Sequence, residues 1–231
     1  MIDAKNISFS YPGGVAALKD VTFRLEDGKK YALVGANGAG KSTLLSLLCA
    51  LEYPHSGKIE IDGITLNKAH TQQIRDRIGM VFQNPDDQLF MPTVYDDIAF
   101  GLRNRGIAED EVSRRVNGLM ENLDIFHLKD RPPYRLSGGE KRIAAIATAM
   151  ILEPRLLLMD EPTAFLDPRA KAGFLRLIKG LQMGMLIATH DLFLAREHMD
   201  GVVILKEGNV FAQGGTDLLE DINLMNEALL A

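Results

Sequence analysis

The sequence of 231 residues contains one cysteine, Cys49, and no apolar run long enough to cross a lipid bilayer. A single cysteine cannot form a disulfide within the chain, which favours a reducing compartment, and its apolar neighbours indicate a packing role. The longest apolar stretch, IAAIATAMILEP, is far shorter than the roughly 20 residues that a spanning helix needs. The opening MIDAKNISFSYPGG lacks the basic-then-apolar layout of a signal peptide. We therefore expect a soluble protein, and docking on a membrane partner stays open.

The sequence also lacks excess positive charge, internal repeats and low-complexity tracts. The formal net charge of −5 argues against a general nucleic-acid-binding surface. With 46% apolar and 25% charged residues, the composition is that of an ordinary globular protein. The length suits one large α/β domain, or such a core with a smaller inserted lobe.

Strand-like and helix-like segments alternate along most of the chain. Residues 2–11 and 18–35 are typical of strands joined by Pro/Gly and Asp-Gly turns, and 201–214 of a hairpin. The pattern predicts an α/β fold with a mostly parallel sheet, helices on both of its faces and an N-terminal antiparallel β part. We expect one domain over residues 1–231, with a helical subdomain inserted at about 84–152.

Within the helical subdomain, the stretch EDEVSRRVNGLMENLDI has the periodicity of an amphipathic helix. Its predicted buried stripe consists of Val112, Val116, Leu119 and Leu123. This periodicity distinguishes the inserted segment from the strands on either side of it.

The segment Tyr31 to Leu48 runs from a strand-like stretch through a glycine-rich loop into a helix, which is the strand–GxxxxGK[ST]–helix pattern of a phosphate-binding loop. Glycines let backbone N–H groups surround a polyphosphate, and the helix N-terminus adds partial positive charge. Lys41 can reach the β- and γ-phosphates of a nucleoside triphosphate, and the Ser42 hydroxyl suits Mg²⁺. The alternative is a glycine-rich turn that binds nothing. The candidate residues are Gly35, Ala36, Asn37, Gly38, Ala39, Gly40, Lys41, Ser42 and Thr43.

Two acidic residues, Asp160 and Glu161, follow the apolar stretch LLLM. Ligands collect at the carboxyl ends of parallel strands, where the phosphate loop also lies. One carboxylate can hold Mg²⁺ through water, and the other can orient or deprotonate an attacking water. The alternative is a pair of acidic caps before a turn.

A second candidate anion site is the sequence LSGGE at 136–140, directly before an apolar helix. Taken alone, the segment is best explained as a serine cap with a glycine turn. One triphosphate does not need two phosphate-binding helix ends in one chain. A symmetric dimer resolves this, because Ser137, Gly138 and Gly139 can serve the nucleotide held by the other subunit.

Taken together, these motifs resemble those of ATP-binding-cassette (ABC) ATPases, the nucleotide-binding subunits of transporters, and the resemblance covers essentially the entire chain. LSGGE resembles the family signature, LLLMDEP the Walker B strand and AFLD the D-loop. His190 resembles the switch histidine, Gln83 the Q-loop glutamine and Tyr11 the aromatic that stacks on adenine. His190 could instead cap the following helix, and Tyr11 could be an edge-strand aromatic.

The resemblance implies that the chain binds ATP and Mg²⁺ and hydrolyses ATP. The residues implied for the phosphates and Mg²⁺ are Lys41, Ser42, Gln83 and Asp160, with Ser42, Gln83 and Asp160 on the metal. Glu161 is implied as the general base or water-positioning residue, and His190 as a contact to the γ-phosphate. Glu140 belongs to the implied nucleotide-binding signature, with Ser137, Gly138 and Gly139.

Two positions depart from the family pattern. Glu140 stands where glutamine is commonest, and Ile143 stands where arginine is usual, with Arg142 one position earlier. The second change leaves open any contact that the family assigns to that arginine.

The stretch from Gln83 to Gln88 resembles the extended Q-loop of energy-coupling-factor and cobalt/nickel (CbiO-type) importers. The resemblance implies docking of the helical subdomain on integral membrane subunits, at the cytoplasmic face of the cell membrane, and a head-to-tail dimer with a second ATPase subunit. Cobalt or nickel is the favoured cargo, and a vitamin such as biotin, thiamine or riboflavin stays an alternative. Leu89 and Phe90 are predicted to be an exposed apolar docking surface, or else to pack inside the lobe.

Two further alternatives belong to other classes. A DNA-maintenance ATPase with the same cassette would carry long coiled coils between the phosphate loop and the signature, yet residues 43–136 show no sustained heptads. A ribosome-associated member usually carries two cassettes, and this chain has one. We expect no nucleic-acid partner. The ending DLLEDINLMNEALLA also leaves little room for an extra C-terminal domain.

Overall fold

A computed structural model describes residues 1–228, and the last three residues of the predicted domain range, 229–231, lie outside the described part. The strands are β1 Ile2–Ser10, β2 Ala16–Leu25, β3 Lys30–Val34, β4 Ser56–Ile61, β5 Ile64–Thr65, β6 Ile78–Val81, β7 Leu156–Asp160, β8 Gly184–Ala188, β9 Gly201–Lys206 and β10 Asn209–Gly214. The α-helices are α1 Lys41–Leu48, α2 Thr71–Arg75, α3 Val94–Asn104, α4 Glu109–Asn122, α5 Gly138–Met150, α6 Pro168–Gly180, α7 Leu192–His198 and α8 Ile222–Glu227. Within residues 1–228, no helix has the length and apolar character needed to cross a membrane.

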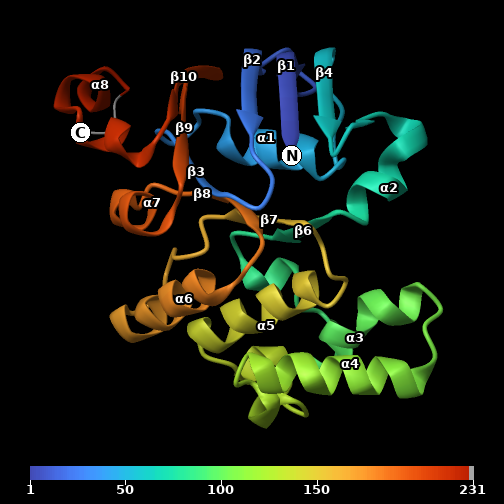
Figure 1. The fold of residues 1–231 in the computed structure, drawn as a ribbon. Helices are drawn as coiled ribbons and strands as arrows, with labels where there is room; N and C mark the ends of the chain where they lie inside the picture. The colour runs from blue at the N-terminus through green and yellow to red at the C-terminus, as the bar shows by residue number, and fades with distance from the viewer. Residues whose placement is uncertain (229–231) are drawn as a thin grey trace.

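Two sheets and a group of helices form successive parts of the molecule (Figure 1). An antiparallel sheet with strand order β2-β1-β4-β5 lies on one side, and a six-stranded sheet with order β10-β9-β3-β8-β7-β6 lies at the centre. The central sheet is parallel except for the antiparallel pair β9–β10. Helices α3, α4 and α5 lie on the side opposite the antiparallel sheet. The predicted α/β class, with its antiparallel N-terminal part, is confirmed.

Three apolar cores hold these parts together. The first packs α1 between the antiparallel sheet and the central sheet, and it includes the buried Cys49, whose thiol pKa is raised by burial to about 12. The second joins the central sheet to residues of α5, α6 and α7. The third lies among α3, α4 and α5, so α5 contributes to two cores and connects the helical group to the central sheet.

The buried stripe of α4 shares Val112 and Val116 with the predicted stripe and differs from it at the other positions. Val112, Val116 and Met120 are fully buried, whereas Leu119 and Leu123 are only partly buried. A face that repeats every four residues from Val112 reaches Met120, and the flexible methionine fills the gap between the helices there.

Strand β6 ends at Val81, two residues before Gln83. The backbone N–H of Phe82 donates to Oε1 of Gln88 at 3.1 Å instead of to a neighbouring strand. The chain then turns through a short 3-10 helix, Pro85–Asp87, in which the side chain of Asn84 accepts from the N–H of Asp86.

The two apolar residues after this turn point in opposite directions. Leu89 is 5% exposed and belongs to the core of the helical group, whereas Phe90 is 64% exposed. The expectation that both are exposed is therefore wrong for Leu89. Asp97 explains the division, because its Oδ1 accepts the backbone N–H groups of Phe90 and Met91 at 2.9 and 3.0 Å and fixes the chain as it leaves the core.

Candidate functional site

The predicted phosphate loop connects the end of β3 to the first turn of α1. Gly38 and Gly40 adopt φ values of +81° and +105°, which side-chain-bearing residues rarely adopt, so glycine is needed there for the backbone conformation. At Gly40 a Cβ would also lie 2.8 Å from the carbonyl oxygen of Ala17. Gly35 is needed for a different reason, because its Cβ would meet the carbonyl oxygen of Leu205 at 2.5 Å. Packing against β9, rather than approach to a phosphate, therefore requires the first glycine.

Lys41 lies buried at the N-terminus of α1, with its side chain turned back over the loop. Its Nζ donates to the carbonyl oxygens of Gly35 at 2.7 Å and Ala36 at 3.3 Å. The same nitrogen lies 3.9 Å from Oε1 of Glu161. The ammonium group thus connects the loop to the end of β7 in the central sheet.

Asp160 ends β7, and Glu161 follows it in a left-handed backbone conformation with φ of 43°. This conformation is costly for a residue with a side chain and is concentrated at functional sites. Both carboxylates are buried, at 7% exposure each. Oδ1 of Asp160 has no hydrogen-bond partner among the described residues, which leaves a buried acceptor available to a ligand.

The imidazole of His190 contacts the second oxygen of Glu161. Nδ1 of His190 lies 2.8 Å from Oε2 of Glu161, and the backbone N–H of His190 donates to the same oxygen at 3.3 Å. Although Glu161 is buried, the His190 side chain is 69% exposed. Glu161 therefore lies between a buried lysine and an exposed histidine, with one oxygen facing each.

Two adjoining hollows bring most of the candidate residues together. One, of about 360 Å³, is lined by Tyr11, Val15, Ala16, Ala17, Asn37, Gly38, Gly40, Lys41, Ser42, Thr43, Gln83, Asp160 and Glu161. The other, of about 620 Å³, is lined by Gly35, Ala36, Asn37, Gln83, Glu161, Thr163, Ala164, Phe165, His190 and Leu192. Asn37, Gln83 and Glu161 line both, so the two hollows meet at these three residues.

Tyr11 stands at the rim of the smaller hollow. Its ring is 41% exposed and meets the ring of Phe9 edge-on, with centroids 5.0 Å apart. Its hydroxyl lies 3.2 Å from Oγ1 of Thr43, the third residue of α1. The ring is thus held beside the phosphate loop with part of its surface open.

The segment Ser137–Glu140 lines neither hollow. Ser137 is the N-cap of α5 and forms a capping box: its Oγ accepts the N–H of Glu140, and Glu140 Oε2 accepts the N–H of Ser137 at 2.8 Å. The backbone hydrogen bond from Ser137 lowers the pKa of the Glu140 carboxyl. Gly139 allows α5 to approach α6, since its Cβ would lie 2.8 Å from Cβ of Ala170. The segment is therefore a helix cap within this chain.

Arg142 is a residue of the site region to which sequence reasoning assigned no contact. Its side chain is 2% exposed and donates from Nη1 to the carbonyl oxygen of Phe82 and from Nη2 to that of Gln83, both at 2.7 Å. Ile143 packs against the core of the helical group instead. The sequence did carry a signal for the burial of Arg142, though not for its partners, because Arg142 precedes Ala145, Ile146 and Ala149 on one apolar helix face.

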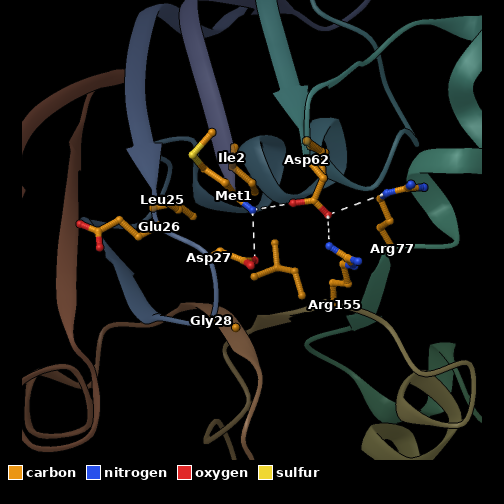
Figure 2. Close-up of a pocket in the computed structure, with 12 residues that line it drawn as sticks. Met1, Ile2, Leu25, Glu26, Asp27, Gly28, Asp62, Arg77 and Arg155 are labelled. Carbon is orange, nitrogen blue, oxygen red and sulfur yellow. Dashed lines mark hydrogen bonds and ion pairs between the residues drawn. The ribbon is translucent and has the colours of Figure 1, made fainter.

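A separate small cavity, shown in Figure 2, contains none of the candidate residues. Its volume of about 20 Å³ is close to the smallest space that holds one water molecule. Ion pairs surround it: Oδ1 of Asp62 lies 2.6 Å from the amino group of Met1, and Oδ2 lies 3.8 Å from both Arg77 and Arg155. These contacts tie the antiparallel sheet to the segments before β6 and β7, which is a structural role.

Comparison with protein families matches residues 18–164 to the family described as ABC transporter. The chain is 39% identical, over 98% of its length and 85% of the relative's, to an energy-coupling factor transporter ATP-binding protein, EcfA, of Carboxydothermus hydrogenoformans. Among solved structures, it resembles cbiO1 of Clostridium perfringens, part of the ABC transporter complex cbiONQ, with a TM-score of 0.87, 35% identity and coverage of 99% of this chain and 93% of that one. It also resembles a dimeric ATP-binding cassette in a post-hydrolysis state with ADP and phosphate, with a TM-score of 0.83, 27% identity and coverage of 94% and 99%.

Proposed function

Since this chain belongs to the ABC transporter family and is an ATP-binding and ATP-hydrolysing subunit, we propose that it energises an importer of the energy-coupling-factor type. One observation carries the proposal. Gln83 lines both hollows beside the phosphate loop and Glu161, and the segment that follows it leads to the exposed Phe90. A change at the nucleotide is therefore within reach of a surface suited to a membrane partner.

The phosphates of ATP would lie against the loop Gly35–Ser42, with Lys41 on the β- and γ-phosphates. Lys41 now donates to two loop carbonyls, and anionic phosphate oxygens are stronger acceptors than these. Tyr11 at the rim would stack on the adenine ring. We propose this placement because the smaller hollow is lined by Tyr11, Asn37, Gly38, Gly40, Lys41 and Ser42.

Mg²⁺ fits the same place, because Asp160 offers a buried oxygen to which no described residue donates a hydrogen bond, and Ser42 and Gln83 line the same hollow. These oxygen donors match the preference of Mg²⁺ for a few protein ligands completed by water and phosphate. When bound, the ion neutralises phosphate charge during phosphoryl transfer. Within the described residues no group of three or more His, Cys, Asp or Glu forms a metal cage, which a site completed by substrate does not need.

For hydrolysis, Glu161 would accept a proton from the attacking water or hold that water in line with the γ-phosphate. Its Oε1 lies 3.9 Å from Nζ of Lys41, which supports this role because Lys41 would bind the γ-phosphate that the water attacks. His190, in contact with Glu161 and largely exposed, would turn to the γ-phosphate when ATP binds. Ser137, Gly138, Gly139 and Glu140 would complete the site from a second subunit in a head-to-tail dimer.

The membrane partner would dock on an aromatic surface made of Phe90 and Phe100. Both rings are exposed, at 64% and 39%, and they meet edge-on with centroids 5.1 Å apart. Exposed paired aromatics beside polar residues are typical of protein interfaces. Docking here would hold the subunit at the cytoplasmic face of the cell membrane.

For the cargo, we propose cobalt or nickel, on the resemblance of the Gln83–Gln88 segment to CbiO-type importers and on the likeness of the chain to cbiO1. The test is purification of the tagged chain with its membrane subunits, reconstitution in vesicles, and measurement of ATP-dependent uptake of radiolabelled cobalt and nickel beside biotin, thiamine and riboflavin. Metal uptake is the expected result. Uptake of a vitamin alone would reject the metal assignment, and failure to recover any membrane subunit would reject the importer.

A further inference from the structure

Arg142 is a fully buried cation at the junction of α5 and the segment that carries Gln83. Its two terminal nitrogens each donate to a backbone carbonyl, those of Phe82 and Gln83. Its Nε has no hydrogen-bond partner, and the guanidinium forms no ion pair within the described part of the chain. The side chain is therefore committed to two consecutive peptide groups rather than to a carboxylate.

Burial of the Arg142 guanidinium without a paired carboxylate among the described residues is not explained by a contribution to stability alone. Burial lowers the pKa of Arg142 to about 10, and the charge of Asp160 only partly opposes this. Burying a charge without a paired anion is costly, and an apolar side chain of similar size often serves a core better. The fork geometry of a guanidinium, by contrast, is suited to holding two oxygens in a fixed relation.

Gln88 holds the same segment to α5 at a second point. Its Nε2 donates to the carbonyl oxygen of Ala145 at 2.8 Å and to Oγ1 of Thr148 at 2.7 Å, while its Oε1 accepts the N–H of Phe82. Lys141 adds an ion pair to Asp86 at 2.6 Å. Residues 82–88 and α5 are thus connected by three side chains.

The side chain of Gln83 is left free by all of these bonds. The backbone carbonyl of Gln83 accepts a hydrogen bond from Arg142. The residue is nevertheless exposed, and it lines both hollows of the proposed nucleotide site. The backbone that carries the Gln83 side chain is therefore held by a residue of α5, the helix that Ser137 caps.

We propose that Arg142 is a positioning residue for ATP hydrolysis: it holds the Gln83 peptide so that the glutamine side chain meets Mg·ATP, and it makes Gln83 and the N-terminus of α5 move as one unit. This inference rests on the proposed role of Gln83 at the metal. It explains how a movement at one nucleotide reaches the helix end proposed to complete the site of the partner subunit.

The test compares Arg142→Lys and Arg142→Gln in two backgrounds, with Gln83 intact and with Gln83→Ala. Neither variant can hold both carbonyls in the geometry of the fork. With Gln83 intact, we expect kcat for ATP hydrolysis to fall by up to about 10²-fold, the effect of a misplaced contact group, with less change in KM. In the Gln83→Ala background the same substitutions should lower kcat by less than about 2-fold, because residues that act through one another are not additive.

A matched control is Arg115→Lys, since Arg115 also donates to a backbone carbonyl, that of Ile151, but lies away from the nucleotide. It should leave kcat unchanged. Three results would each overturn the inference. The first is an equal loss of kcat from Arg142→Lys in both backgrounds, the second is an unchanged kcat of the Arg142 variants with Gln83 intact, and the third is failure of both Arg142 variants to fold. If Gln83→Ala alone leaves kcat unchanged, the proposed role of Gln83 is wrong and the inference falls with it. A loss in Gln83→Ala without a loss in the Arg142 variants rejects the inference alone.

Discussion

Glu161 combines a left-handed backbone conformation, deep burial and contacts to Lys41 and His190. Replacing it with glutamine keeps the size and the hydrogen bond to His190 but removes the ability to accept a proton. We expect Glu161→Gln to retain ATP binding and to lower kcat by about 10²–10⁴-fold, the range for a general base. Fluorescent-nucleotide titration and steady-state phosphate release measure the two quantities.

Glu121→Gln provides the control. Glu121 is exposed on α4 and lines neither hollow, so this substitution makes the same chemical change away from the site. Its turnover should equal that of the parent. Full turnover by Glu161→Gln at saturating Mg·ATP would show that this carboxylate neither performs nor positions the chemical step.

At the residue scale, the sequence was informative where chemistry depends on a local pattern. The order of strand, glycine loop, lysine and helix predicted the loop and the place of Lys41 and Ser42 in the first turn of the helix, because the residues that form the loop are adjacent in sequence. The contacts of Arg142 could not be identified in this way. Its partners are the carbonyls of Phe82 and Gln83, and backbone carbonyls at long sequence separation leave no mark in residue types.

At the scale of elements, two adjacent residues of the segment between β6 and α3 face opposite environments. Leu89 packs inside the helical group, and Phe90 faces outward beside Phe100. We expect Phe90→Ser to lose assembly with the membrane subunits and uptake while the melting temperature stays the same. Leu89→Ser should lower stability by about 2–5 kcal/mol, as large-to-small core changes do.

Co-purification and thermal denaturation of the two single variants distinguish these roles, and each variant is the control for the other. A Phe90→Ser protein that is stable and still assembles and transports would contradict docking on this surface. A Phe90→Ser protein with a clearly lowered melting temperature would instead assign the residue to packing.

The strands and long helices were predictable because each has its own hydrophobic period or a turn with glycine or proline. The order of strands in the central sheet was not, since β3 lies between β8 and β9, which are far from it in sequence. The direction of Leu89 was not predictable either. It depends on Asp97, a carboxylate in the next helix, which holds the backbone at Phe90 and Met91.

At the scale of the whole molecule, the N-terminus of α1 faces the hollows and that of α5 does not. Lys41 begins α1 at the proposed nucleotide site, whereas Ser137 caps α5 outside both hollows. The capping box uses Glu140 to satisfy the N–H of Ser137, and the serine itself remains exposed. An exposed helix end of this kind is accessible to a second subunit.

We expect ATP to shift the Glu161→Gln protein from monomer toward dimer in sedimentation velocity, because nucleotide that is bound but not hydrolysed holds the two subunits together. Adding Ser137→Arg should abolish the shift, since the side chain places bulk where the γ-phosphate of the other subunit must approach. Ser137→Ala is the matched control. Both substitutions remove the cap, at a cost of about 1 kcal/mol in stability, but only arginine adds bulk.

The comparison of these two variants separates capping from assembly. If Ser137→Arg and Ser137→Ala lower the melting temperature equally and only Ser137→Arg stays monomeric with ATP, the helix end lies in the dimer interface. Normal dimerisation of Ser137→Arg would mean that α5 begins away from the partner's nucleotide, and the capping box would then be the whole role of Ser137 and Glu140. Because Arg142 lies on the same helix, that result would also confine its action on Gln83 to a single subunit.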